Sequence, residues 1–258
     1  MTAVFLHGVP ETGAIWNGVR LRLADAEVPS VALDLPGFGS PRPAGFGATK
    51  EEYAQWLAAE LRGFDGPVDL VGHDWGAGIV LRVVTAFDVP VRSWAVDCAS
   101  VTHRDVVWHD MARIWRTPGR GEDWMAEFVA ASADAGGRPG EPGWMKTALL
   151  ASCPTPGDAA QIEKDLDSTM GECILALYRS ATPNIFADWG AELSRPTSAP
   201  GLVLRATADD SDDPARSAEM ARGLGARTAE LARLGHWWMM EDPDAAVTAL
   251  RSFWASSP

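Results

Sequence analysis

Short apolar segments alternate with amphipathic helical patterns along most of the chain. Apolar and β-branched segments that end near Gly, Asp or Pro predict strands at 3–6, 30–33, 68–71, 94–96, 202–204 and 228–231. Helical periodicity predicts helices at 13–24, 49–62 (with Thr49 as N-cap), 77–87, 214–223 and 244–254. Strands and helices in this order form a mostly parallel sheet between helical layers. The sequence therefore predicts an α/β fold.

The interval 100–198 breaks this alternation. It contains no convincing strand, and its helical patterns at 103–116, 122–133, 143–151 and 158–180 are separated by Pro and Gly. A helical insertion above the strand ends is a common way to enclose a pocket. We therefore expect a core first part at 1–99, a helical cap at 100–198 and a core second part at 199–258.

Charge and composition exclude several classes of partner. The chain has 22 Lys and Arg against 35 Asp and Glu, so its net charge of −13 repels nucleic acids and anionic membrane surfaces. No apolar run reaches the roughly 18 residues that a membrane span needs, and the N-terminus lacks a basic region typical of a signal peptide. Three widely spaced cysteines, Cys98, Cys153 and Cys173, are expected to be free thiols. These features predict a cytoplasmic protein.

The segment Gly72-His73-Asp74-Trp75-Gly76 lies between a predicted strand and a predicted helix. It matches the G-x-nucleophile-x-G turn, in which small flanking residues permit a sharp bend. Asp74 occupies the nucleophile position. A carboxylate there can displace a leaving group from saturated carbon and form an ester with the substrate, which water must then cleave. The alternative is an ordinary glycine-rich turn.

Three further motifs make the chain resemble the α/β-hydrolase family over essentially its whole length. His7-Gly8-Val9-Pro10-Glu11 resembles the family's HGxP loop, 34–40 resembles its D-x-P-G-x-G-x-S turn, and Gly235-His236-Trp237 resembles the segment with the catalytic histidine. The resemblance implies that His236 activates water. It also implies that backbone N–H groups of Val9 and Trp75 form an oxyanion hole.

The acid that orients His236 should follow a strand between the nucleophile and the histidine. Asp209 comes directly after the predicted strand at 202–204 and is our choice. Its neighbours Asp210, Asp212 and Asp213 remain alternatives, as does Asp97, which follows an earlier strand.

Family members with an Asp nucleophile are mainly epoxide hydrolases, haloalkane dehalogenases and haloacetate dehalogenases. These enzymes differ in the leaving group and in the residues that stabilise it. Leu177-Tyr178-Arg179-Ser180 resembles the lid segment in which an epoxide hydrolase carries a proton-donating tyrosine. The usual second lid tyrosine is missing, since Tyr53 lies in a predicted core helix. The candidates for the position of this second donor are Trp115, Trp108 and His109. The resemblance therefore predicts an epoxide hydrolase with Tyr178 as acid.

Aromatic residues are expected to line the substrate pocket, namely Trp75, Trp108, His109, Trp115 and Trp237. Two indole N–H donors would also suit a halide, so a haloalkane dehalogenase is the main alternative, although Val9 stands where many dehalogenases carry Asn. A haloacetate dehalogenase ranks third, because no cation stands beside the nucleophile. A ligand-binding protein without catalysis is a further alternative.

No metal or cofactor is expected. His7, His73 and His236 lack the spacing of a known metal motif, and no dinucleotide fingerprint is present. The expected partners are water and a small apolar epoxide or halide. The chain begins directly in its first predicted strand, so the resemblance implies that the N-terminal hairpin of the family is missing and the sheet has about six strands. One exposed edge would then favour a homodimer.

Overall fold

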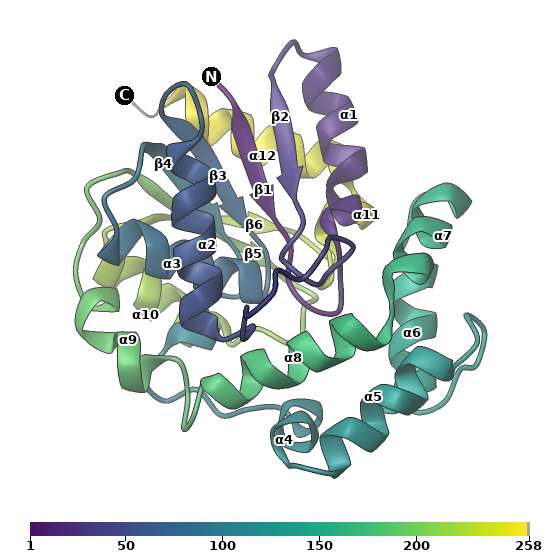
Figure 1. Ribbon diagram of the computed structural model, residues 1–258. Helices are drawn as coiled ribbons and strands as arrows, with labels where there is room; N and C mark the ends of the chain where they lie inside the picture. Colours follow the sequence, from purple (N-terminus) through teal and green to yellow (C-terminus); the bar gives the residue numbers. More distant parts are fainter. Residues whose placement is uncertain (257–258) are drawn as a thin grey trace.

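The computed structural model describes residues 1–256 and contains one parallel sheet of six strands (Figure 1). The strand order is β2–β1–β3–β4–β5–β6, and every neighbouring pair runs parallel. The strands are β1 (Ala3–Leu6), β2 (Ser30–Leu33), β3 (Val68–Gly72), β4 (Val91–Val96), β5 (Gly201–Ala206) and β6 (Arg227–Leu231). This confirms the predicted α/β fold and the number of strands.

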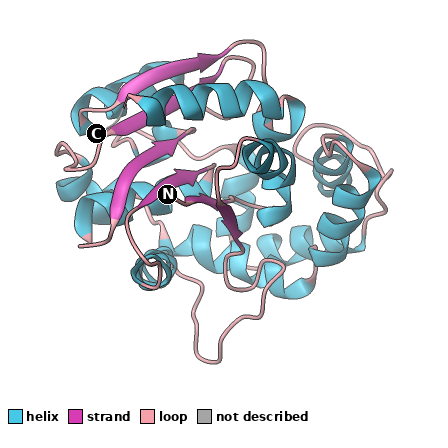
Figure 2. Ribbon diagram, turned by 90° about the horizontal axis from the view of Figure 1, so that it is seen from above, coloured by secondary structure: helices cyan, strands magenta, loops and turns pink. Residues whose placement is uncertain are grey.

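Helices cover both faces of this sheet, and a perpendicular view shows how the strands twist between them (Figure 2). On one face, α1 (Asn17–Asp25) packs against α12 (Pro243–Ala255). The other face carries α2 (Lys50–Arg62), α3 (Trp75–Ala86) and α10 (Pro214–Leu224). Thr49 and Glu52 form a reciprocal capping box, which explains why α2 begins at Lys50 as the sequence predicts.

The chain between β4 and β5 is helical throughout its regular parts. It comprises the short turn η2 (Ala99–Thr102), then α4 (Asp110–Arg116), α5 (Arg120–Ala130), α6 (Pro142–Ala151), α7 (Pro156–Asp165), α8 (Ser168–Ser180) and α9 (Phe186–Leu193). Helices α4 to α8 lie together beyond one end of the sheet (Figure 1). The carboxyl ends of the strands point towards them.

Several predicted helix boundaries are wrong. The pattern at 158–180 forms two helices, because Asp167 leaves the helical conformation and its side chain accepts a hydrogen bond from the Met170 amide to cap α8. The pattern at 103–116 becomes helical only at Asp110, where the His109 side chain caps α4. The first predicted helix opens with a 3₁₀ turn, η1 (Gly13–Trp16), while α9 and the short α11 (Trp238–Glu241) were not predicted.

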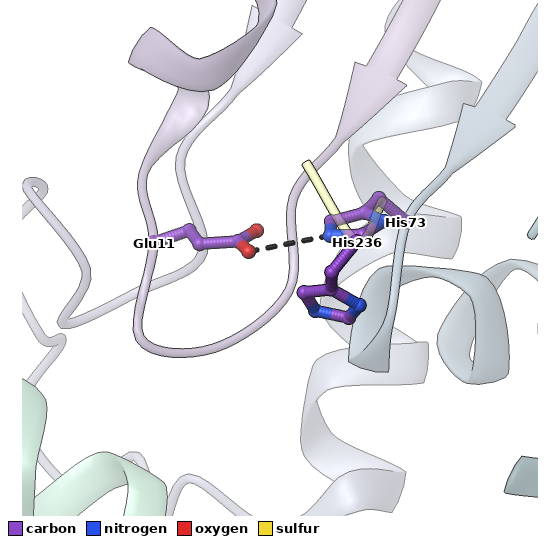
Figure 3. A group of neighbouring side chains, drawn as sticks. All are labelled: Glu11, His73 and His236. Carbon is purple, nitrogen blue, oxygen red and sulfur yellow. Dashed lines mark ion pairs between the residues drawn. The ribbon is translucent and has the colours of Figure 1, made fainter. Parts of the chain in front are cut away.

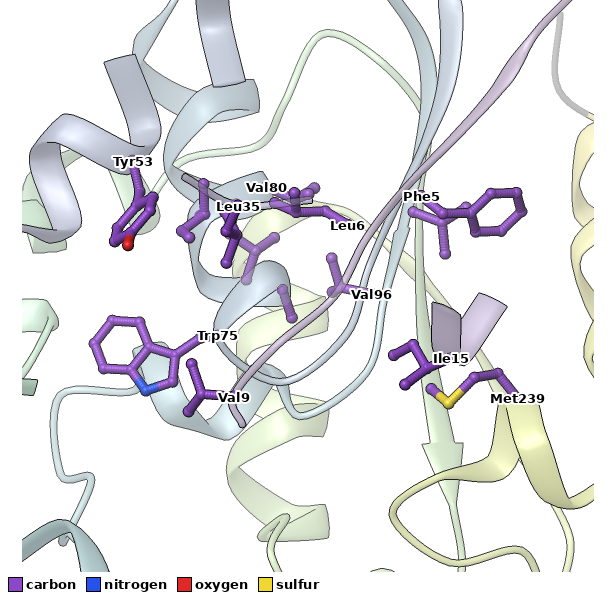
Figure 4. Packing of buried hydrophobic residues seen from close by; sticks show 14 of the residues in the cluster. Phe5, Leu6, Val9, Ile15, Leu35, Tyr53, Trp75, Val80, Val96 and Met239 are labelled. Carbon is purple, nitrogen blue, oxygen red and sulfur yellow. The ribbon is translucent and has the colours of Figure 1, made fainter. Parts of the chain in front are cut away.

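The core lies between the sheet and its helices. Phe5 and Leu6 of β1, Val80 of α3 and Val96 of β4 are fully buried there (Figure 4). Below them, Val9 and Trp75 lie close to each other where β1 and β3 have ended. The core thereby fixes two loops side by side at the carboxyl edge of the sheet.

Two exterior features concern the predicted partners. Strands β2 and β6 form the edges of the sheet, and the predicted homodimer stays a prediction. Within residues 1–256, none of the helices combines the length and the apolar character needed to cross a membrane.

Candidate active site

Asp74 lies at a sharp turn between β3 and α3. Its backbone adopts φ 51° and ψ −118°, a conformation that costs free energy in any residue other than glycine. The turn packs tightly against the loop after β1: a Cβ atom at Gly76 would come within 2.5 Å of the His7 carbonyl oxygen, and one at Gly8 would collide with the Asp74 carboxylate. The two glycines therefore allow the carboxylate to face the His7–Glu11 loop.

The Asp74 carboxylate accepts a hydrogen bond from a predicted oxyanion-hole donor. The Val9 amide donates to Asp74 Oδ1 at 3.0 Å, while Trp75, the second predicted donor, is the first residue of α3. Burial raises the pKa of Asp74 to about 6, and this effect outweighs the opposing influence of His236. Because Oδ1 already faces the Val9 amide, Oδ2 is the oxygen that remains available to attack a substrate.

His236 and Asp209 form a hydrogen-bonded pair. His236 Nδ1 donates to Asp209 Oδ2 at 2.9 Å, and the Ser211 amide donates to Asp209 Oδ1 at 2.8 Å. Burial lowers the pKa of His236, but the bond to Asp209 outweighs it and the net pKa is raised. This bond places the imidazole proton on Nδ1 and leaves Nε2 free to accept a proton from water.

The structure also shows what the other candidate acids do. Asp212 accepts hydrogen bonds from the hydroxyls of Ser100 and Ser217, and Asp213 caps α10 through backbone amides. Asp210 is exposed. Asp97 lies beneath the nucleophile turn, where its Oδ1 accepts a hydrogen bond from the Asp74 amide at 3.1 Å. Of the five candidates, Asp209 is the one that contacts His236.

A buried cluster of charged side chains was not predicted from the sequence. His73 lies between two carboxylates: Nδ1 is 2.5 Å from Asp97 Oδ2, and Nε2 is 3.2 Å from Glu11 Oε1. Figure 3 shows Glu11 opposite His73, with His236 beside it. Although burial lowers the pKa of His73, the two carboxylates raise it well above the usual value. His73 is therefore an imidazolium, and it holds the pKa of buried Glu11 at about 2.

The same cluster also anchors the loop that carries His236. Trp237 Nε1 donates to Glu11 Oε1 at 2.6 Å, and Trp238 Nε1 donates to Asp97 Oδ2 at 2.5 Å. The two carboxylates thus join the loops that position the nucleophile, the oxyanion hole and the base. In the sequence, the signal for this arrangement is the pair of tryptophans that follows His236, together with acidic residues in two strand-end loops.

Asp74 and His236 face a cavity of about 220 Å³ beneath α4 and α8. Tyr178 lines the same cavity and is almost fully buried. Its ring packs against three tryptophans, with ring centroids 5.1 Å from Trp75, 5.4 Å from Trp108 and 4.9 Å from Trp115. Of the predicted pocket residues, Trp108, His109, Trp115 and Trp237 line the cavity, whereas Trp75 is buried behind Tyr178 and does not. Burial, followed by the charge of Asp74, raises the pKa of Tyr178 well above its usual value. The phenol consequently stays protonated at neutral pH.

A family model described as "Alpha/beta hydrolase family" matches residues 3–250 of the chain. The chain belongs to the α/β-hydrolase family. The family model identifies this protein as a hydrolase of the α/β fold, and the sheet and the order of Asp74, Asp209 and His236 agree with that membership.

Solved structures and one curated protein are similar to this hydrolase. Haloalkane dehalogenase DbeA from Bradyrhizobium elkani USDA94 superposes with a TM-score of 0.71 at 21% identity, covering 99% of this chain and 91% of that one. A thermophilic esterase from Thermogutta terrifontis gives a TM-score of 0.71 at 21% identity, covering 99% and 89%. Lipase LipV from Mycobacterium tuberculosis is 39% identical over 83 residues, which is 31% of this chain and 30% of LipV.

The structure distinguishes the three candidates for a second lid donor in this hydrolase. Trp108 Nε1 already donates to the Pro183 carbonyl at 2.9 Å. His109 Nδ1 accepts the Ala112 amide at 3.1 Å and its pKa is lowered to about 4, mainly by burial, so its proton resides on Nε2. Trp115 Nε1 is buried and has no hydrogen-bond partner within residues 1–256. Trp115 and His109 therefore retain a donor for a ligand.

The three histidines considered as metal ligands are not gathered at one point of the hydrolase. His7 Nε2 accepts the Leu35 amide at 3.0 Å and Nδ1 donates to the Gly8 carbonyl, so both ring nitrogens are occupied. His73 and His236 lie together, with ring centroids 4.6 Å apart. Donor atoms close enough to share an ion occur in three groups: Glu11, His73 and His236; His73, Asp97 and Cys98; and Cys98, Asp209 and His236.

Proposed function

We propose that this hydrolase opens a small epoxide to a vicinal diol through an ester on Asp74. The observation that carries the proposal is the protonated phenol of Tyr178 in the same cavity as Asp74 and His236. A strained ring opens at carbon only if its oxygen receives a proton or a strong hydrogen bond. The arrangement supplies a nucleophile and an acid around one small, largely apolar cavity.

In the first step, Asp74 Oδ2 attacks an epoxide carbon and forms the ester bond. The carbon–oxygen bond of the ring breaks, and the released oxygen takes the proton of the Tyr178 hydroxyl. Trp115 or His109 orients that oxygen by donating a hydrogen bond. Tyr178 regains its proton from water, because burial disfavours a lasting phenolate. The hydroxide that remains is neutralised by the proton that the Asp74 carboxylic acid loses after the ester has been cleaved.

In the second step, water attacks the carbonyl carbon of the ester and passes a proton to His236 Nε2. Asp209 stabilises the resulting imidazolium through Nδ1. The negative charge on the carbonyl oxygen is stabilised by the Val9 amide, which already donates to Asp74 Oδ1, and by the Trp75 amide. The bond between the acyl carbon and the diol oxygen then breaks, and that oxygen takes the proton from His236.

Removing the Tyr178 hydroxyl tests the assignment of the acid. We expect Tyr178→Phe to slow epoxide opening by about 10²-fold or more, because the ring oxygen loses its proton donor while the aromatic packing is kept. Rapid mixing with an epoxide, followed by mass analysis of the Asp74 ester, measures this step directly. Unchanged ester formation in Tyr178→Phe would contradict the proposal.

Tyr53, the other tyrosine of the chain, provides the matched control. It is buried in α2, and its hydroxyl donates to the Pro36 carbonyl at 2.9 Å. Tyr53→Phe removes the same atom away from the cavity and should cost stability of about 1 kcal/mol without slowing the reaction.

A haloalkane dehalogenase is the second candidate, and the buried indole of Trp115 favours it. Trp115 lines the cavity, and its buried N–H has no hydrogen-bond partner within residues 1–256, so it is a suitable donor to a departing halide. In that case Trp115→Phe would suppress halide release from haloalkanes, whereas Tyr178→Phe would leave the release unchanged.

A further inference from the structure

Three donor atoms of different chemical types meet beside the catalytic cavity. Cys98 Sγ lies 3.5 Å from Asp209 Oδ2, and His236 Nδ1 lies 2.9 Å from the same oxygen. All three atoms are within 4.8 Å of one another. Cys98 and His236 also line the cavity, so a small ion in the cavity can reach them.

These separations fit a tetrahedral zinc ion. Zinc binds sulfur at about 2.3 Å and nitrogen or oxygen at about 2.0 Å, so tetrahedral ligand atoms of these types lie about 3.3–3.5 Å apart. The sulfur–oxygen separation already falls in that range, and the nitrogen–oxygen separation needs a widening of only a few tenths of an ångström. The fourth position would be open for water from the cavity.

The charges around the three atoms also favour a dication. Burial and the neighbouring carboxylates of Asp97, Asp209 and Asp212 raise the pKa of Cys98 and keep the thiol protonated in the metal-free protein. A bound dication displaces that proton, and the resulting thiolate and the Asp209 carboxylate neutralise Zn²⁺ completely. The other close groups are less suitable, because each includes His73, whose two ring nitrogens already face the carboxylates of Asp97 and Glu11.

We propose that Cys98, Asp209 and His236 form an inhibitory site for zinc and similar thiophilic divalent ions. Zn²⁺ binds His236 Nδ1 in place of the proton there, and that proton moves to Nε2 of the same ring. The Cys98 thiol releases its proton to solvent. His236 can then no longer accept a proton from water, so the metal blocks the second step of the reaction. This consequence rests on the proposed function, but the binding of zinc does not.

Calorimetric titration of the purified, metal-free protein with zinc chloride tests the site without any substrate. We expect one Zn²⁺ per chain, and at least about tenfold weaker binding to Cys98→Ser and Cys98→Ala, because a hydroxyl or methyl group replaces a soft thiolate ligand. Cys153→Ser makes the same chemical change between α6 and α7, and this variant should bind Zn²⁺ with the affinity of the original protein. Equal affinity in all four proteins would overturn the proposal.

X-ray absorption of the zinc-loaded original protein gives a second readout that requires no variant. One sulfur neighbour at about 2.3 Å, together with nitrogen or oxygen neighbours, is the expected shell. A shell without sulfur would refute the assignment. Zinc should also cause the Asp74 ester to accumulate during turnover of an epoxide. If zinc binds through Cys98 and no ester forms, the proposed reaction fails while the metal site stands.

Discussion

Asp74→Asn should lower turnover by at least about 10⁴-fold, because an amide is a poor nucleophile towards saturated carbon and no ester can form. Asn has nearly the same shape, keeps an oxygen for the Val9 amide and tolerates a positive φ better than most residues. The fold should therefore survive the change. Steady-state kinetics with the best epoxide of a panel, together with thermal unfolding, measure both effects.

The stability of Asp74→Asn carries separate information. Burial raises the pKa of Asp74 to about 6, so the folded protein binds a proton more tightly there than the unfolded chain does. The ionised carboxylate consequently destabilises the fold above pH 6, and this cost shrinks as the pH falls from about 6 to the ordinary carboxyl pKa of about 4, below which it is absent. Asp74→Asn should melt at the same or a higher temperature at pH 8. Full activity, or unfolding, would contradict the assigned role.

The second large effect concerns Asp97, whose carboxylate holds three donors in the buried cluster. Asp97→Ala leaves the His73 imidazolium with one carboxylate partner and removes the acceptor of the Trp238 indole and of the Asp74 amide. We expect a loss of about 3–5 kcal/mol in the free energy of unfolding, as for other broken buried charge pairs. Urea denaturation followed by tryptophan fluorescence measures it.

Two further variants calibrate that measurement. Asp97→Asn keeps the shape and one acceptor oxygen, so its loss should be smaller than that of Asp97→Ala. Asp25→Ala removes an exposed carboxylate at the end of α1 and should change stability by no more than about 0.5 kcal/mol. If Asp97→Ala were as stable as Asp25→Ala, the cluster would not stabilise the three loops as described.

Local sequence patterns were sufficient for the strands and for the turn that carries Asp74. Most of the β-strands contain a short apolar run, and the turn needs glycines at fixed positions beside its bend, so both leave a signal within a few residues. The choice of Asp209 was also possible, because the family places the acid directly after a strand. These features depend on neighbours in the sequence.

Longer-range features could not be predicted in the same way. The indole of Trp237 meets Glu11 from 226 residues away, and that of Trp238 meets Asp97 from 141 residues away. The pair of tryptophans after His236 is visible in the sequence, but nothing local indicates which carboxylates they meet. The break between α7 and α8 depends on the side chain of Asp167, which caps a helix instead of continuing one. A periodic pattern alone does not distinguish these outcomes.

The proposed mechanism requires that Asp74 becomes covalently bound to the substrate and that His236 activates the water that cleaves this bond. Intact mass spectrometry of His236→Gln protein, after incubation with epoxides and haloalkanes, detects the covalent intermediate itself. Without the base, the ester on Asp74 should accumulate, and its mass should exceed that of the free protein by the whole epoxide. A gain of haloalkane minus hydrogen halide would establish the dehalogenase alternative. The absence of any adduct, or full turnover by His236→Gln, would contradict the mechanism.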